Sequence, residues 1–128
     1  MSNNRIAQTI TDSVTAITVK EGLVVIDRTS AGAPIPVPAP IDGKDDGKVL
    51  EVIGKNTFPW QLLSPFVDPD PRLNIFWMPG LGGNSQLDSL DDTTVNLGAN
   101  VRLIAMKGLW IVQNCVTVNG VQNGVTPD

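Results

Sequence analysis

Histidine and tyrosine are absent from this chain of 128 residues, and cysteine occurs once, at position 115. The absence of histidine excludes Ser-His-Asp and Cys-His catalytic arrangements, histidine-ligated zinc and the commonest general base near neutral pH. A single cysteine builds neither an intramolecular disulfide nor a thiolate zinc site, and we expect the Cys115 thiol to be buried. We therefore expect no enzymatic activity, no cofactor and no metal.

Charged residues are also scarce, at 17% of the chain against about 25% in ordinary soluble domains. Nine basic and thirteen acidic side chains give a net charge of -4, which disfavours binding to nucleic acid or to an anionic membrane. No apolar run approaches the roughly 18 residues needed to span a bilayer, and the first residues lack an apolar leader segment. We expect a protein made in the cytosol that forms a homo-oligomer.

Helical periodicity is nearly missing, because no window keeps an apolar stripe over three turns without Gly, Pro or β-branched residues. Short strand-like segments alternate instead with turn dipeptides. This spacing predicts an all-β fold, an antiparallel β-sandwich or a jelly-roll-like barrel. We expect a single domain over 16–128 after an extended N-terminal arm over 1–15. The predicted strands are 16–20, 22–27, 49–53, 59–63, 73–78, 93–97, 101–106 and 109–113.

Four prolines alternate with other residues in the stretch APIPVPAPI, at positions 34, 36, 38 and 40. Because proline has no backbone N–H, this stretch is not a central strand. It is an edge strand, a stiff connector, or an arm that lies on a neighbouring subunit. The third alternative gains from the fixed φ angles of proline, which reduce the entropy lost on docking.

Aspartates gather in three segments, DGKDDG, DPDP and LDSLDD. A calcium loop that begins at Asp42 does not match the EF-hand pattern, because Lys44 stands third and Ile53 twelfth. The sequence places no two carboxylates in one cleft, as a glycosidase requires. We therefore expect these aspartates to lie in solvated turns.

Aromatic residues concentrate in two segments, NTFPWQLLSPF and NIFWMPGLGG. Each places aromatic and aliphatic side chains on consecutive positions, so whichever face of a strand enters the core, the other presents an aromatic ring. Trp60, Phe66, Trp77 and Met78 are therefore candidates for a subunit interface or a ligand platform. The alternative is that most of them fill the core.

The segment NVRLIAMKGLWIVQ, residues 100–113, predicts a hairpin that is apolar on both faces. We expect Val101, Leu103 and Ala105 to enter the core, and Ile104 and Met106 to contact a neighbouring subunit. A tight turn is expected at Gly108, with a positive φ, and Trp110 should pack across the hairpin rather than bind a ligand.

Two stretches, LEVIGKNTFPWQLL and TTVNLGANVRLIAMKGLWIVQNCVTVN, resemble the β-rich modules of virion surface proteins in tailed bacteriophages. The shared pattern is a glycine before alternating apolar residues, a short turn that ends in glycine, and a strand with tryptophan and valine. It covers roughly residues 16–119, although Pro59 and the long insertion at 65–83 depart from it. The matching positions are Gly98, Val101, Leu103, Ala105, Gly108, Trp110 and Val112.

Such modules occur in head decoration proteins, head fibres and tail-associated fibres, and they are commonly trimeric. The resemblance implies a capsid decoration (cement) protein, made in the host cytoplasm, that binds the major capsid protein on the virion surface as a homotrimer. Two alternatives remain: a head or tail fibre domain that binds a host receptor, and a carbohydrate-binding module without a viral role. A hydrolase with an acid pair is a further alternative.

Overall fold

The computed structural model describes residues 5–30, 32–56, 58, 60–66, 75–78, 86–87, 89–92, 98–113 and 125–127. This part of the chain is rich in strands and contains no helix, as the sequence predicts. The strands are β1 (Ile6–Ile10), β2 (Gly22–Ile26), β3 (Ile35–Pro36), β4 (Val49–Gly54), β5 (Gln61–Leu63), β6 (Phe76–Trp77), β7 (Gln86–Leu87), β8 (Ser89–Asp92), β9 (Asn100–Met106), β10 (Leu109–Gln113) and β11 (Val125–Pro127).

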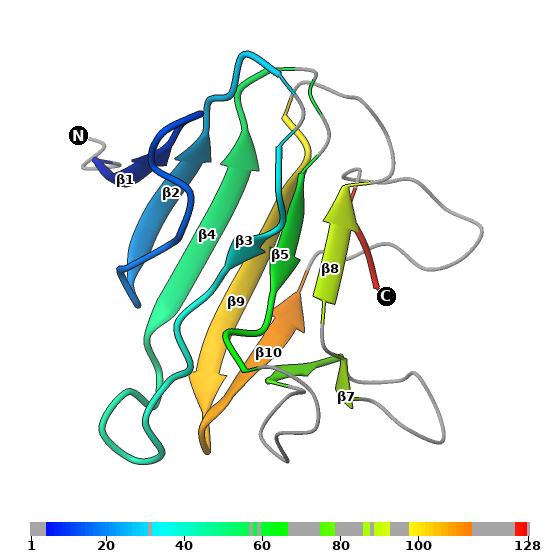
Figure 1. Ribbon diagram of the computed structural model, residues 1–128. Coiled ribbons are helices and arrows are strands. Elements are labelled where there is room, and N and C mark those ends of the chain that lie inside the picture. The colour runs from blue at the N-terminus through cyan, green and yellow to red at the C-terminus, as the bar shows by residue number, and fades with distance from the viewer. Residues whose placement is uncertain are drawn as a thin grey trace.

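The strands form two sheets. The large sheet has the order β1-β2-β4-β9-β10-β6-β7, and the small sheet has the order β11-β8-β5-β3. In Figure 1, β3 and β5 lie in front of the large sheet, and β8 stands beside β5. The prediction of antiparallel sheets is only partly right, because β2 runs parallel to β1 and to β4, and parallel pairs also join β6 to β10 and β3 to β5. The chain leaves β2, passes through β3 in the small sheet and then enters β4, so β2 and β4 point the same way.

One apolar core draws side chains from both sheets. The hairpin contributes Val101, Leu103 and Ala105, which are almost completely buried, and the small sheet contributes Leu62 and Leu90. Successive side chains of a strand point to opposite faces, so this set occupies the inner face of β9. The predicted inner half of the hairpin is confirmed.

The hairpin turn consists of Lys107 and Gly108, with φ angles of 54° and 77°. Met106 pairs directly with Leu109, and two positive φ values in a two-residue connection are typical of a type I′ turn. The Lys107 N–H donates to Oδ1 of Asp46 at 3.1 Å, which ties the turn to the loop before β4. The positive φ predicted for Gly108 is confirmed.

Part of the predicted N-terminal arm belongs to the large sheet. The strand β1 pairs in parallel with β2, and Ile10 is completely buried. The Gln8 side chain fastens the following segment, because its Nε2 donates to the Ala16 carbonyl at 2.9 Å and its Oε1 accepts from the Thr18 N–H at 2.8 Å. The polar residues before and after IAQTI suggested an arm, whereas the pairing with β2 makes it a strand.

Three predicted strands differ from the structure, and one lies outside the described residues. Residues 16–20 are not a strand, because Ile17 turns into the core and its N–H donates to the Pro36 carbonyl at 3.0 Å. Of the strands predicted over 59–63 and 73–78, the described residues 60, 75 and 78 are not part of a strand, and the strands found are Gln61–Leu63 and Phe76–Trp77. The strand predicted over 93–97 falls outside the described part of the chain, as does Cys115.

The proline segment is an edge strand, one of the three predicted alternatives. It forms β3, the last strand of the small sheet. An edge strand needs no backbone hydrogen bonds on its free side, so the missing N–H groups of proline are tolerated there. Ile35 and Val37 are completely buried, and the Val37 N–H donates to the Leu63 carbonyl at 2.9 Å. The segment thus packs against its own chain on one side, and its contact with a neighbouring subunit stays a prediction.

Candidate interaction face

The large sheet has a second face, which points away from the core. We call it the outer face, and it is defined by side chains of β2, β4, β9, β10 and β6 that alternate with the core residues. They are arranged in rows, because paired residues of neighbouring strands point to the same side of a sheet. The outer-face residues are Leu23, Val25, Val49, Glu51, Ile53, Trp77, Asn100, Arg102, Ile104, Met106, Leu109, Ile111 and Gln113.

One row of the outer face is apolar across four strands. Val49 of β4 pairs with Ile104 of β9, Ile104 pairs with Ile111 of β10, and Ile111 pairs with Trp77 of β6. The first three side chains are half-buried, and Trp77 is 36% exposed. Met106 lies beyond this row on the same face of β9 and is 41% exposed. A continuous apolar row on a sheet face is typical of a contact surface.

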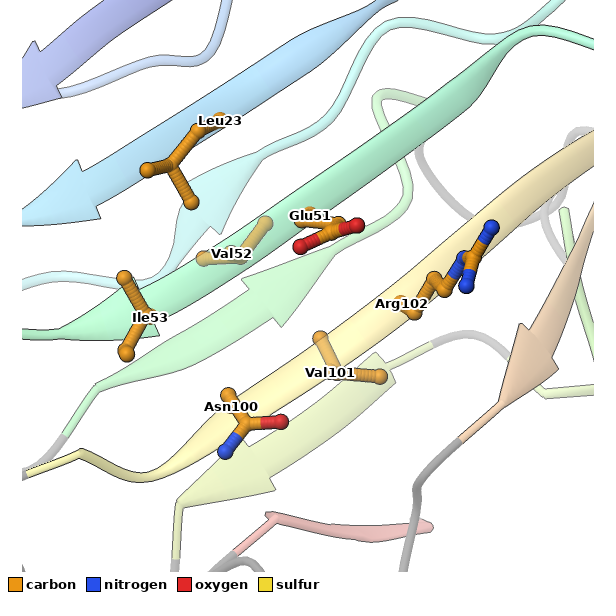
Figure 2. A pocket seen from close by; sticks show the side chains of 7 residues that line it. All are labelled: Leu23, Glu51, Val52, Ile53, Asn100, Val101 and Arg102. Carbon is orange, nitrogen blue, oxygen red and sulfur yellow. The ribbon is translucent and has the colours of Figure 1, made fainter. Parts of the chain in front are cut away.

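The next row is charged at its centre. Glu51 of β4 pairs with Arg102 of β9, and Leu23 and Gln113 continue the row on either side. Both charged side chains are exposed, and Figure 2 shows them on neighbouring strands of one face. Within the described part of the chain, neither makes an ion pair or a side-chain hydrogen bond. Among the described residues, two opposite charges thus stand side by side without forming an ion pair.

Two hollows mark the same surface. One, of about 290 Å³, lies over β2, β4 and β9 and is lined by Leu23, Glu51, Ile53 and Arg102 among others (Figure 2). A more apolar hollow of about 400 Å³ adjoins it at Ile53 and reaches to β1. The outer face is therefore uneven, and side chains of a protein partner would fit into its hollows.

Two of the predicted interface residues belong to the core instead. Trp60 is 4% exposed and Met78 is 8% exposed, so neither reaches a partner, and the prediction is wrong for both. The Trp60 ring packs over Gly54, where an added Cβ would lie 2.8 Å from the indole Nε1. The lack of a side chain at position 54 makes room for the ring, and the sequence segment around Trp60 did not reveal this.

The other four candidates lie at or near the surface. Ile104 and Trp77 share the apolar row, and Met106 lies one row further along β9. Phe66 is half-buried and packs against the core, away from this row. The structure therefore brings three of the six predicted interface residues together on the outer face.

Sequence reasoning missed the charged pair at the centre of the face. Glu51 and Arg102 are the only charged residues within VLEVIG and NVRLIAM, which are otherwise apolar apart from Asn100. A single charge in the middle of such a strand is a usable signal, because it must point away from the core. The pairing of Glu51 with Arg102 could not be predicted, because it depends on the register of two strands that are far apart in sequence.

The prediction of solvated aspartates is wrong for Asp45, which is 1% exposed. Its carboxylate accepts from Lys48 Nζ at 2.9 Å, from Lys20 Nζ at 3.1 Å and from the Ile41 N–H at 2.7 Å. The Ile41 hydrogen bond, followed by the two lysines, holds the pKa of this carboxyl well below its usual range. The carboxylate thus fastens the loop 41–48.

Asp42 and Asp46 are exposed as predicted, whereas Asp68, Asp70 and Asp88 lie outside the described residues.

Asp45 should make the stability of the fold depend on pH. A carboxyl whose pKa is lowered by folding stabilises the native state above its unfolded pKa, about 4, and this contribution is lost as the pH falls further. We expect the wild type to lose stability between pH 5 and strongly acidic pH by more than an Asp45→Asn variant, which is less stable at pH 7. Urea unfolding at several pH values checks this. Equal pH slopes for the two proteins would contradict the assignment.

The described residues hold no group of three His, Cys, Asp or Glu side chains that fits a metal ion. Nor do they include a helix long and apolar enough to cross a membrane. No protein-family model matches the chain, and no curated protein or solved structure matches it either.

Proposed function

We propose that the chain is a structural protein of a virion surface, of the capsid decoration type, and that it works by assembly rather than by catalysis. The observation that carries this proposal is the outer face of the large sheet. It combines a continuous apolar row with a pair of opposite charges that make no ion pair among the described residues. Such a surface fits a protein partner.

The positions of the phage-module resemblance support the same proposal. Gly98 and Gly108 have φ angles of 89° and 77°, and Trp110 is completely buried. They shape the hairpin that places Ile104 and Arg102 on the outer face. We also propose that the two sheets are the halves of a β-sandwich, as the resemblance implies. The trimer and the attachment to a major capsid protein stay predictions of that resemblance.

The proposed mechanism is mechanical. Apolar surface that assembly removes from water contributes about 25 cal/mol per Å² to the free energy of association. Part of this is lost because the partners become ordered. Repetition of the subunit around a shell adds avidity without stronger individual contacts. The chain has few charged residues, and its strands carry apolar side chains on both faces. Both features suit a subunit whose surface is buried by neighbouring subunits in an assembly.

Labelling of virus particles tests the proposed function. An antibody against the full chain should label the surface of purified particles from cells that produce the protein, and mass spectrometry should find many copies per particle. The control is the same preparation from cells in which the gene is deleted. Particles that lack the chain, while the cell extract contains it, would contradict a role on the virion.

Glycan binding is a second candidate function, because the ring of Trp77 is exposed. A sugar stacks on an exposed aromatic face, and Trp77 offers one at the end of the apolar row. A glycan array probed with the wild type and with Trp77→Ala distinguishes the two functions. Binding that disappears in the variant would favour a receptor-binding fibre domain or a carbohydrate-binding module over a decoration protein.

A further inference from the structure

We propose that the outer face of the large sheet binds a second copy of this chain, about a twofold axis that runs parallel to the strands between β4 and β9. The inference rests on the proposed function in using the same assembly face, and it adds the partner and the symmetry. Three features of the outer face support such a dimer: the order of its rows, the positions of its two charges and its area.

The charges fit a twofold axis of this direction. A rotation about it lays β4 of one copy over β9 of the other, at the same height along the strands. Glu51 then faces the partner subunit's Arg102, and Arg102 faces the partner subunit's Glu51. A contact across a twofold axis repeats every pair in this reciprocal way. Two side chains that make no ion pair with the described residues of their own chain thus gain two ion pairs.

The apolar row fits the same axis. Val49 and Ile104 are direct partners on β4 and β9, one row from the charged pair. The rotation lays Val49 over the partner subunit's Ile104, so apolar side chains cover apolar side chains. An axis across the strands would instead lay Glu51 over the partner subunit's Glu51 and cost several kcal/mol. The charges therefore select the direction of the axis.

The size of the face agrees with a dimer contact. The thirteen side-chain positions of the outer face, each about 4.8 Å by 7 Å, span roughly 440 Å² in projection. The accessible area of a face covered by side chains exceeds its projection, so it approaches the about 800 Å² that each partner buries in a standard interface. Aligned sheets pack with their strands about 30° apart, which keeps the central rows in contact.

Charge reversal on the full-length chain tests the proposal. Sedimentation equilibrium at concentrations up to about 100 μM should show that the wild type is a dimer. Arg102→Glu makes the central pair wholly acidic and Glu51→Arg makes it wholly basic, so each variant should dimerise at least about 100-fold more weakly. The control is Lys44→Glu, which changes the net charge as Arg102→Glu does but lies in an exposed loop, and it should remain dimeric.

A mixture of the two variants gives the sharpest result. Each is expected to be monomeric alone, whereas an equimolar mixture should form a heterodimer, because the acidic pair of one then faces the basic pair of the other. The double variant Glu51→Arg/Arg102→Glu should likewise regain the dimer. Circular dichroism of every variant checks that the fold is kept.

Several outcomes would overturn the proposal. They are a wild type that stays monomeric at about 100 μM, a trimer, and a mixture that fails to associate although both variants are folded. A trimer would favour the assembly that the phage-module resemblance implies. A dimer that never appears on virus particles would contradict the proposed function alone, whereas a monomer that still labels particles would contradict this inference alone.

Discussion

Replacing Leu103 by alanine should lower the free energy of unfolding by about 2–5 kcal/mol, the range for a truncated buried leucine. Leu103 is completely buried on the inner face of β9 and belongs to the core shared by the two sheets. The variant loses the transfer free energy of the removed methyl groups and leaves a cavity that its neighbours only partly fill. Urea unfolding at neutral pH, followed by circular dichroism, measures the effect.

The neighbouring residue provides a matched control for the face. Ile104 follows Leu103 in the chain but is half-buried on the outer face. Replacing Ile104 by lysine should change the free energy of unfolding by less than about 1 kcal/mol, because the lysine stem lies along the sheet and its amine reaches water. The same variant should not associate, because the charge would be desolvated opposite the partner subunit's Val49.

The two variants together separate the two faces of the hairpin. Leu103→Ala is expected to unfold earlier yet to associate like the wild type while folded, and Ile104→Lys is expected to behave in the opposite way. Size-exclusion chromatography beside thermal unfolding records both properties. If Ile104→Lys remained folded and assembled, the outer face of β9 would meet water in the assembly. If it unfolded, Ile104 would belong to the core.

The hairpin is the part of the fold that the sequence predicts well, and the reason is local. Strand alternation has a period of two, and the connection Lys107-Gly108 joins β9 directly to β10. The inner and outer side chains therefore follow from the segment alone. The same holds for the proline segment, since four missing N–H groups exclude a central strand wherever the segment lies.

The parts that the sequence did not predict depend on distant partners. The parallel pairing of β1, β2 and β4 is set by a chain that crosses to the small sheet in between. Asp45 is buried because Lys20 reaches it from 25 residues earlier, together with Lys48. The pairing of Glu51 with Arg102 depends on a register between β4 and β9 that no local pattern fixes. The candidate face was thus only half predicted, through its apolar residues.

Trp110 links the large sheet to the proline segment. Its ring is completely buried, and its indole Nε1–H donates to the Pro38 carbonyl at 2.8 Å. Pro38 follows the edge strand β3, whose neighbour Val37 donates its N–H to Leu63 in the small sheet. One side chain thus spans from β10 to the edge of the opposite sheet, which explains why the hairpin needs a tryptophan rather than another apolar residue.

Replacing Trp110 by alanine should lower the free energy of unfolding by about 3–5 kcal/mol, which is a large part of the stability of a domain of this size. Trp110→Phe should cost less, about 1–3 kcal/mol, because it keeps most of the apolar ring but leaves the Pro38 carbonyl without its donor. Urea unfolding measures both values. Hydrogen exchange adds a local readout: in Trp110→Phe the Val37 amide should exchange faster, while the amides of β9 that pair with β4 keep the protection expected for the remaining stability. Unchanged exchange at Val37 would show that Trp110 acts only by filling the core and does not hold the proline segment in place.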